Sequence, residues 1–169
     1  MSLEERLAEA LRLKEVPRAG WLRVGVAQPE SVAAHSWGVA WLVLVLCPEG
    51  LDRGRALAIA VLHDLGEARI GDITPHDGIP HEDKQRRERE AMTAMTASLA
   101  TGDELMSLWL EYEEASSPEG RFVKACDKLD MALQAHRYRE RDGVDTRELV
   151  ASALRVLDDE TLVALAEGP

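Results

Sequence analysis

The sequence predicts an all-α fold, a bundle of helices around an apolar core. Apolar residues recur at three- and four-residue spacing along most of the chain, which is the period of an amphipathic helix. No segment alternates apolar and polar residues with the β-branched and aromatic enrichment that is typical of strands. Hydrophobic residues make up 46% of the 169 residues, which is enough to bury a core. The length favours a single domain over residues 1–169.

Capping residues and breaks in the apolar pattern delimit the predicted elements. Ser117 offers a cap before a proline at the first helical position, and Asp103 and Asp145 can cap the helices that they begin. Two segments that contain prolines and glycines, Val16–Glu30 and Gly71–Pro80, are predicted to be ordered loops, where binding groups often lie. The predicted helices are Ser2–Lys14, Ser31–Cys47, Asp52–Glu67, Pro80–Leu99, Asp103–Ala115, Pro118–Arg141, Asp145–Leu157 and Glu160–Glu167.

The second predicted helix is apolar on all sides from Trp37 to Cys47, apart from Gly38. This run is about half of the ~20 residues that a helix needs to cross a bilayer. We therefore expect a core helix that other helices surround. Its tryptophans, Trp37 and Trp41, are expected in the core or in contacts between two copies of the chain, as is Trp109.

Charge and composition exclude several classes of function. The chain has 20 Lys and Arg against 31 Asp and Glu, a net charge of −11 that opposes binding to DNA, RNA or anionic lipid. Its acidic start is unlike a signal or transit peptide. Cys47 and Cys126 have no metal-binding or redox spacing, so both are expected to be reduced. We expect a cytoplasmic protein with no polynucleotide partner and no membrane attachment.

An adjacent histidine and aspartate, His63 and Asp64, follow an aliphatic run within the predicted helix Asp52–Glu67. A buried ionised carboxylate lowers the stability of the fold by several kcal/mol unless a positive charge pairs with it, and a divalent metal ion supplies such a charge. Glu67 lies one turn further along the same predicted helix. The pair taken alone also fits a core histidine that hydrogen-bonds a capping carboxylate.

Two further polar residues occur in apolar surroundings on other predicted helices. His35 lies near the start of the apolar helix, and Asp127 follows an apolar turn. With His63 and Asp64 they form a His2Asp2 set, which suits a borderline divalent ion such as Mn, Co, Fe, Ni or Zn. Asp130 competes with Asp127 as a ligand, but a surface salt bridge to Lys128 or Arg137 is its expected role.

The order His35, His63-Asp64, Asp127 resembles the H…HD…D signature of the HD-domain metal-dependent phosphohydrolases. More narrowly, the chain is similar to the YfbR-like branch of HD-domain 5′-deoxynucleotidases and its eukaryotic relatives. A bare His-Asp pair is weak evidence, whereas six ordered segments at compatible spacing are strong evidence. The matching segments are Val16–Trp21, Pro29–His35, His63–Glu67, Ile70–Pro75, Glu82–Arg87 and Phe122–Asp127.

The resemblance implies a fold, an activity and a set of site residues. It implies an HD-domain helical bundle, a homodimer, and removal of the 5′-phosphate from deoxynucleoside 5′-monophosphates with one divalent metal (Co, Mn, Zn, Ni or Fe). Glu67 and Asp72 match the family's catalytic acidic pair. Arg18 matches a phosphate-contacting arginine. Trp21, three residues later in the same loop, is expected either to line the substrate pocket or to anchor that loop. The implied ligands are His35, His63, Asp64 and Asp127.

Two other functions compete with this one. The chain fits an HD-type enzyme of different chemistry, either a hydrolase of another phosphate ester or a di-iron oxygenase, and the oxygenase requires a second metal. It also fits a non-catalytic helical module that retains the metal. Glu67, Asp72 and Arg18 favour an enzyme, because a site without activity has no need for them. Aromatic residues make up only 4% of the chain, so we expect weak discrimination between bases.

Overall fold

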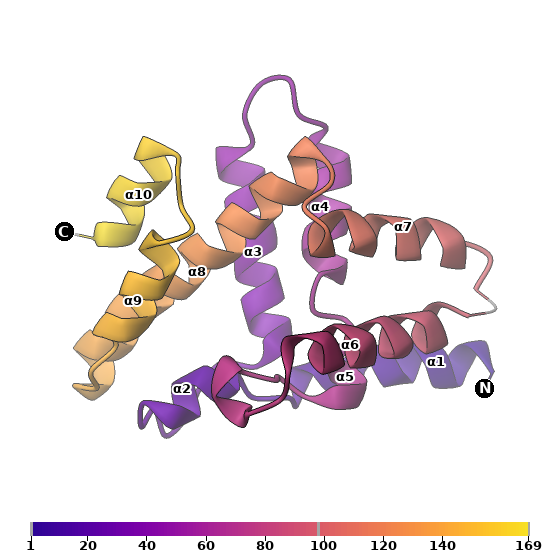
Figure 1. Cartoon of the computed structure of the whole chain (residues 1–169), viewed down its shortest axis with the longest axis horizontal. Helices are drawn as coiled ribbons and strands as arrows, with labels where there is room; N and C mark the ends of the chain where they lie inside the picture. The colour runs from indigo at the N-terminus through magenta and orange to yellow at the C-terminus, as the bar shows by residue number, and fades with distance from the viewer. Residues whose placement is uncertain (1, 98, 169) are drawn as a thin grey trace.

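The computed structural model describes residues 2–97 and 99–168, and these residues form helices joined by short connections (Figure 1). The described part of the chain contains one isolated β-bridge, between Pro17 and Ser31, and the all-α prediction is confirmed. The elements are α1 (Leu3–Ala10), η1 (Leu11–Lys14), α2 (Ala19–Arg23), α3 (Val32–Leu46), α4 (Arg53–Leu62), α5 (Glu67–Ile70), η2 (Pro75–Asp77), α6 (His81–Thr96), α7 (Gly102–Glu113), α8 (Pro118–Asp142), α9 (Arg147–Leu154) and α10 (Glu160–Glu167).

The centre of the molecule is built from α3, α4 and α8, which pack against one another (Figure 1). Ser117 caps α8 by accepting a hydrogen bond from the Gly120 amide, and Pro118 occupies the first turn, as predicted. The central core includes Val43 of α3, Ile59 of α4 and Cys126 of α8, all fully buried. Cys126 is a free thiol, which agrees with the expectation that it is reduced, and it packs in this core as a small apolar residue.

Further helices pack around this centre, among them α7, which packs against α4 and α8. In Figure 1, α9 and α10 lie along the C-terminal part of α8, and α5 and α6 lie near the N-terminal end of α3. α10 packs against both α8 and α9, while α5 packs against η1 and α6. No helix within residues 2–97 and 99–168 is long and apolar enough to cross a membrane.

The expectation that other helices surround α3 on all sides is wrong. Val39 and Val43 are fully buried, but Trp37 is 70% exposed and Trp41 is 54% exposed. The physical reason is that α4 and α8 contact one side of α3 and leave the opposite face open. A core position is therefore wrong for these two tryptophans, whereas Trp109 is buried.

The predicted helix Asp52–Glu67 is interrupted where the His-Asp pair occurs. α4 ends at Leu62, residues 63–66 form turns, and α5 begins at Glu67. The amide of Leu65 bonds the carbonyl of Leu62, and that of Glu67 bonds the carbonyl of Asp64, so the chain tightens to i→i+3 bonds. His63 and Asp64 thus project from a tight turn instead of from one face of a regular helix.

Other boundaries differ from the prediction at their ends. The loop Val16–Glu30 contains the short helix α2, and Gly71–Pro80 contains the single turn η2. Asp103 does not begin a helix, because α7 starts one residue earlier at Gly102. Asp145 accepts a hydrogen bond from the Arg147 amide just before α9. The predicted helix over residues 80–99 ends at Thr96, and residue 98 lies outside the described residues.

Candidate active site

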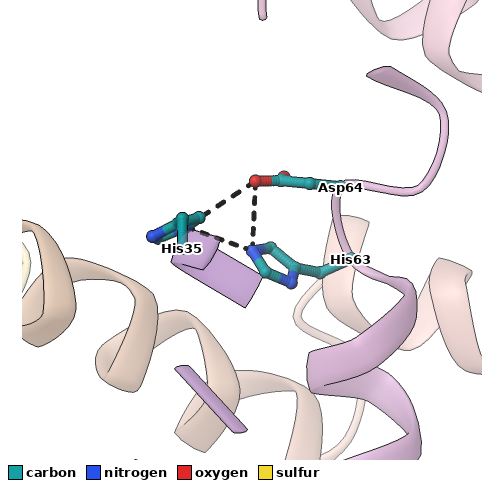
Figure 2. Close-up of side chains that lie close together, drawn as sticks. All are labelled: His35, His63 and Asp64. Atoms are coloured by element: carbon teal, nitrogen blue, oxygen red, sulfur yellow. Dashed lines mark hydrogen bonds and ion pairs between the residues drawn. The ribbon is translucent and has the colours of Figure 1, made fainter. Parts of the chain in front are cut away.

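Three potential metal ligands converge at the centre of the bundle (Figure 2). His35 extends from the first turns of α3, His63 follows the last residue of α4, and Asp64 lies in the turn beyond. The two histidine Nε2 atoms are 3.4 Å apart. Asp64 Oδ2 lies 3.2 Å from His63 Nε2 and 3.6 Å from His35 Nε2. A nitrogen or oxygen from each residue can therefore contact one ion.

The outer nitrogen of each histidine is held by a fixed acceptor. His63 Nδ1 donates to the carbonyl oxygen of Ala60 at 2.7 Å, and His35 Nδ1 donates to Asp130 Oδ2 at 2.8 Å. A carbonyl or a carboxylate can only accept, so the proton of each neutral ring resides on Nδ1. In this neutral form the Nε2 lone pairs point into the cluster, which is the arrangement that metal-binding histidines require. A cation that binds there would replace the second proton that His35 carries below its pKa.

Asp127 adjoins the cluster from α8. Its Oδ1 lies 3.2 Å from His35 Nε2, whereas its Oδ2 accepts hydrogen bonds from the Tyr112 hydroxyl at 3.0 Å and Lys128 Nζ at 2.9 Å. These donors hold one oxygen and leave the other beside the histidine. Among the described residues, the compact group comprises His35, His63 and Asp64, and Asp127 contacts it through His35.

The carboxylates around this cluster favour a positive charge within it. Burial and Arg18 lower the pKa of His35, but hydrogen bonds to Asp127 and Asp130 outweigh them and raise it to about 9. Burial alone raises the pKa of Asp64, and the neighbouring His63 and Arg18 reverse this effect and lower it below its ordinary value. Two imidazole nitrogens and carboxylate oxygens are a donor set that suits a borderline divalent cation. The residues present therefore fit the metal that the sequence predicts.

Glu67 has a buried oxygen without a partner. The side chain is 6% exposed, and its Oε2 has no hydrogen-bond partner among the described residues. Burial, together with repulsion from Asp64 and Asp72, raises the pKa of Glu67 to about 10. An unsatisfied buried acceptor costs about 1–3 kcal/mol, so such groups are found where a ligand or a water binds.

Arg18 and Asp72 come from two different loops and meet beside the cluster. Arg18 Nη1 lies 3.4 Å from Asp64 Oδ2 and 3.7 Å from Asp72 Oδ1. Asp72 Oδ2 accepts a hydrogen bond from the Ala19 amide at 2.8 Å, which ties its loop to the start of α2. Burial lowers the pKa of Arg18, but Asp64 and Asp72 outweigh it and raise the pKa above its ordinary value.

Trp21 both lines the pocket and anchors its own loop. The side chain is buried, and its Nε1 donates to Glu30 Oε1 at 3.0 Å. Its ring meets that of Tyr138 edge-on, with centroids 5.1 Å apart. The same residue borders the cavity next to the cluster. The two sequence-based interpretations of Trp21 are thus compatible.

A cavity of about 570 Å³ opens beside the cluster. This is within the usual range for small-molecule sites, about 300–1,000 Å³. Seven of the eight predicted site residues line it, and His35 lies behind them. Six Lys and Arg and seven Asp and Glu border the cavity, so its charge is nearly balanced, in contrast to the −11 of the whole chain. The lining includes Arg18, Trp21, His63, Asp64, Glu67, Asp72 and Asp127.

Sequence reasoning missed several residues that support this site. The surface salt bridge expected for Asp130 is wrong, because its carboxylate pairs with His35 in the interior. Asp130 lies three residues after Asp127, so both fall on one face of α8, and that spacing is the signal that could have found it. Nothing in the sequence connects Tyr112 to Asp127, and only the packing of α7 on α8 brings the tyrosine there. Lys128 follows Asp127 directly, and its ion pair is with this neighbour and not with Asp130.

Comparison with known proteins agrees with this geometry. Residues 10–162 match the HD domain family. The chain is 41% identical over 134 residues to the 5′-deoxynucleotidase HDDC2 of Danio rerio, covering 78% of this chain and 67% of that protein. It is 41% identical over 136 residues to the 5′-deoxynucleotidase hdd1 of Schizosaccharomyces pombe, covering 77% and 69%. The crystal structure of the PH0347 protein from Pyrococcus horikoshii OT3 superposes with a TM-score of 0.83 at 33% identity, covering 98% and 99%.

Proposed function

This chain belongs to the HD domain family, and we propose that it is a metal-dependent phosphohydrolase that removes the 5′-phosphate from deoxynucleoside 5′-monophosphates. The observation that carries the proposal is the convergence of His35, His63 and Asp64 beside a cavity that also holds Arg18 and Glu67. Two relatives named as 5′-deoxynucleotidases cover more than three quarters of the chain and support the choice of substrate. We further propose that residues 1–169 form one HD domain in a cytoplasmic protein.

One divalent cation, Co, Mn, Zn, Ni or Fe, is the proposed cofactor. His35, His63, Asp64 and Asp127 would hold it. The surrounding hydrogen bonds engage the outer histidine nitrogens and Asp127 Oδ2, which leaves both Nε2 atoms and Asp127 Oδ1 for the ion, and Asp64 Oδ2 lies within 3.6 Å of both Nε2 atoms. When bound, such a cation supplies Lewis-acid polarisation of the phosphoryl group and makes water more acidic. A dication also turns the nearly balanced charge of the cavity positive, which favours a phosphate dianion.

Glu67 is the proposed general base. Glu67 would have a lower pKa with a dication bound to the cluster, so that its free Oε2 can orient the attacking water and take a proton from it, while the water oxygen forms the new bond to phosphorus. The bond between phosphorus and the 5′-oxygen of the sugar breaks in the same displacement, and the leaving oxygen receives a proton from Asp72 or from water. The products are inorganic phosphate and a deoxynucleoside.

Arg18 and Asp72 are proposed to position the nucleotide. The Arg18 guanidinium offers several N–H donors that match phosphate oxygens, and its charge stabilises the transition state more as negative charge accumulates. Asp72 restrains Arg18 and is itself held by the Ala19 amide. Since Asp72 lines the cavity, its carboxylate is also placed to accept a hydrogen bond from the sugar 3′-hydroxyl. Trp21 forms part of the wall on this side.

A homodimer is the proposed assembly, and the exposed face of α3 supports it. Trp37, Trp41, Leu44 and Val45 follow the i, i+4, i+7, i+8 pattern of one helix face, and each is about half exposed or more. Contiguous exposed apolar patches of this kind mark protein interfaces. A second copy of the chain is the proposed occupant of this face.

Phosphate release tests the proposed activity. The protein is treated with a chelator, supplied with one metal at a time, and assayed with deoxy- and ribonucleoside 5′- and 3′-monophosphates. Metal-dependent release from the deoxynucleoside 5′-monophosphates is expected, with weak discrimination between bases. A protein with both His63→Ala and Asp64→Ala should stay helical and release no phosphate. Activity retained by that variant, or no release from any monophosphate with any metal, would contradict the proposal.

A further inference from the structure

The side of His35 that faces away from the cluster is held by Asp130. Asp130 Oδ2 lies 2.8 Å from His35 Nδ1, and the two side chains are 15% and 1% exposed. Glu30 lies close to the same pair, but its carboxylate already accepts a hydrogen bond from Trp21 Nε1. Asp130 is therefore the acceptor that fixes which nitrogen of His35 carries the proton and how the ring is turned.

Gly38 makes room for this carboxylate. Gly38 lies three residues after His35 on α3, one turn along the same face. A Cβ placed on Gly38 would overlap Asp130 Oδ1 and lie 3.0 Å from its Cγ, and the three nearest atoms all belong to Asp130. The carboxylate thus fills the space that any larger residue at position 38 would occupy.

Conformational freedom does not explain a glycine here. Gly38 lies in the interior of a regular helix and is absent from the positive-φ residues of the described chain. Glycine is a poor helix former compared with alanine, so the position carries a cost for helix stability. The contact with Asp130 is the feature that offsets this cost.

We propose that Gly38 and Asp130 together position His35 as a metal ligand, with Asp130 orienting the ring and Gly38 admitting the carboxylate. This inference rests on the proposed function, because it assumes that the cluster binds a cation. Neither residue lines the cavity, so both act through His35. Partners of this kind change metal affinity by about 10–100-fold in other proteins.

A double-mutant cycle tests the proposal. Gly38→Ala, Asp130→Ala and the double variant are compared with the unaltered protein for Co²⁺ affinity, by competition with a chromophoric chelator after metal removal. Each single change is expected to weaken Co²⁺ binding about 10–100-fold. The double variant should bind no more weakly than Asp130→Ala alone, because the added methyl group then meets no carboxylate. Circular dichroism checks that all variants keep their helices.

Controls separate a positioning role from a general packing effect. Gly54→Ala, a helical glycine in α4 outside the site, should leave Co²⁺ affinity unchanged. Asp130→Asn keeps the shape and should weaken binding less than Asp130→Ala, which preserves the test if the alanine variant fails to fold. Unchanged affinity in the Asp130 variants, or a Gly38→Ala effect that persists without Asp130, would overturn the proposal. Absence of binding of every proposed cation (Co²⁺, Mn²⁺, Zn²⁺, Ni²⁺ and Fe²⁺) by the unaltered protein would instead overturn the proposed function together with it.

Discussion

The two faces of α3 carry similar apolar residues but differ in what they contact. The inner face, with His35, Val39 and Val43, packs against α4 and α8 and supplies a donor to the metal cluster. The outer face, with Trp37 and Trp41, is open. Hydrophobicity alone therefore does not identify the buried side of an apolar helix. The polar residue His35 identifies that side, because a buried imidazole needs hydrogen-bond partners, and those partners lie on α8.

The largest expected effect comes from the polar residue of the inner face. His35→Ala removes one proposed ligand, so we expect loss of bound metal and a fall in phosphate release of at least about 10³-fold, equivalent to about 4 kcal/mol. Elemental analysis and a phosphate assay measure the two quantities. Full metal content with normal turnover would show that His35 is not a metal ligand of the site.

Changing the proposed base separates metal binding from chemistry. Glu67→Gln preserves shape but cannot take a proton, so we expect phosphate release to fall by about 10²–10⁴-fold. The metal content should stay the same, because Glu67 is outside the ligand cluster. Comparing kcat with elemental analysis checks both statements. An unchanged kcat would exclude Glu67 as the base.

A matched pair of valines measures the packing difference between the two faces. Val43 is fully buried, whereas Val45, two residues along, is 58% exposed. Val43→Ala is expected to lower the free energy of unfolding by about 2 kcal/mol through lost burial and a residual cavity. Val45→Ala should change it by less than about 0.5 kcal/mol. Urea denaturation gives both values, and equal losses would refute the assigned faces.

The smallest expected effect on activity comes from the outer face. Trp41→Glu puts a charge on the proposed contact between two copies, so a dimer should become a monomer in light-scattering measurements. The phosphate released per chain is expected to stay within about twofold, since Trp41 does not border the cavity. An unchanged dimer mass would show that the outer face of α3 is not the interface.

The sequence predicts the helical fold and the position of the His-Asp pair, but not the break beside that pair. The predicted helix Asp52–Glu67 runs through residues 63–66, and their hydropathy does not reveal the change to i→i+3 hydrogen bonds. The role of Asp130 depends on how closely α8 approaches Gly38, which no local pattern records. Resemblance, and not periodicity, pointed to Arg18 and Asp72, which are distant in sequence and 3.7 Å apart in space.

Metal content measured together with turnover tests the central claim most directly. The protein as purified, after chelation, and after addition of single divalent metals is assayed for bound ions by elemental analysis and for phosphate release from a deoxynucleoside 5′-monophosphate. We expect about one ion per chain, loss of release on chelation, and recovery when the metal is restored. Two ions per chain, or full turnover by the metal-free protein, would contradict a single-metal phosphohydrolase built on His35, His63 and Asp64.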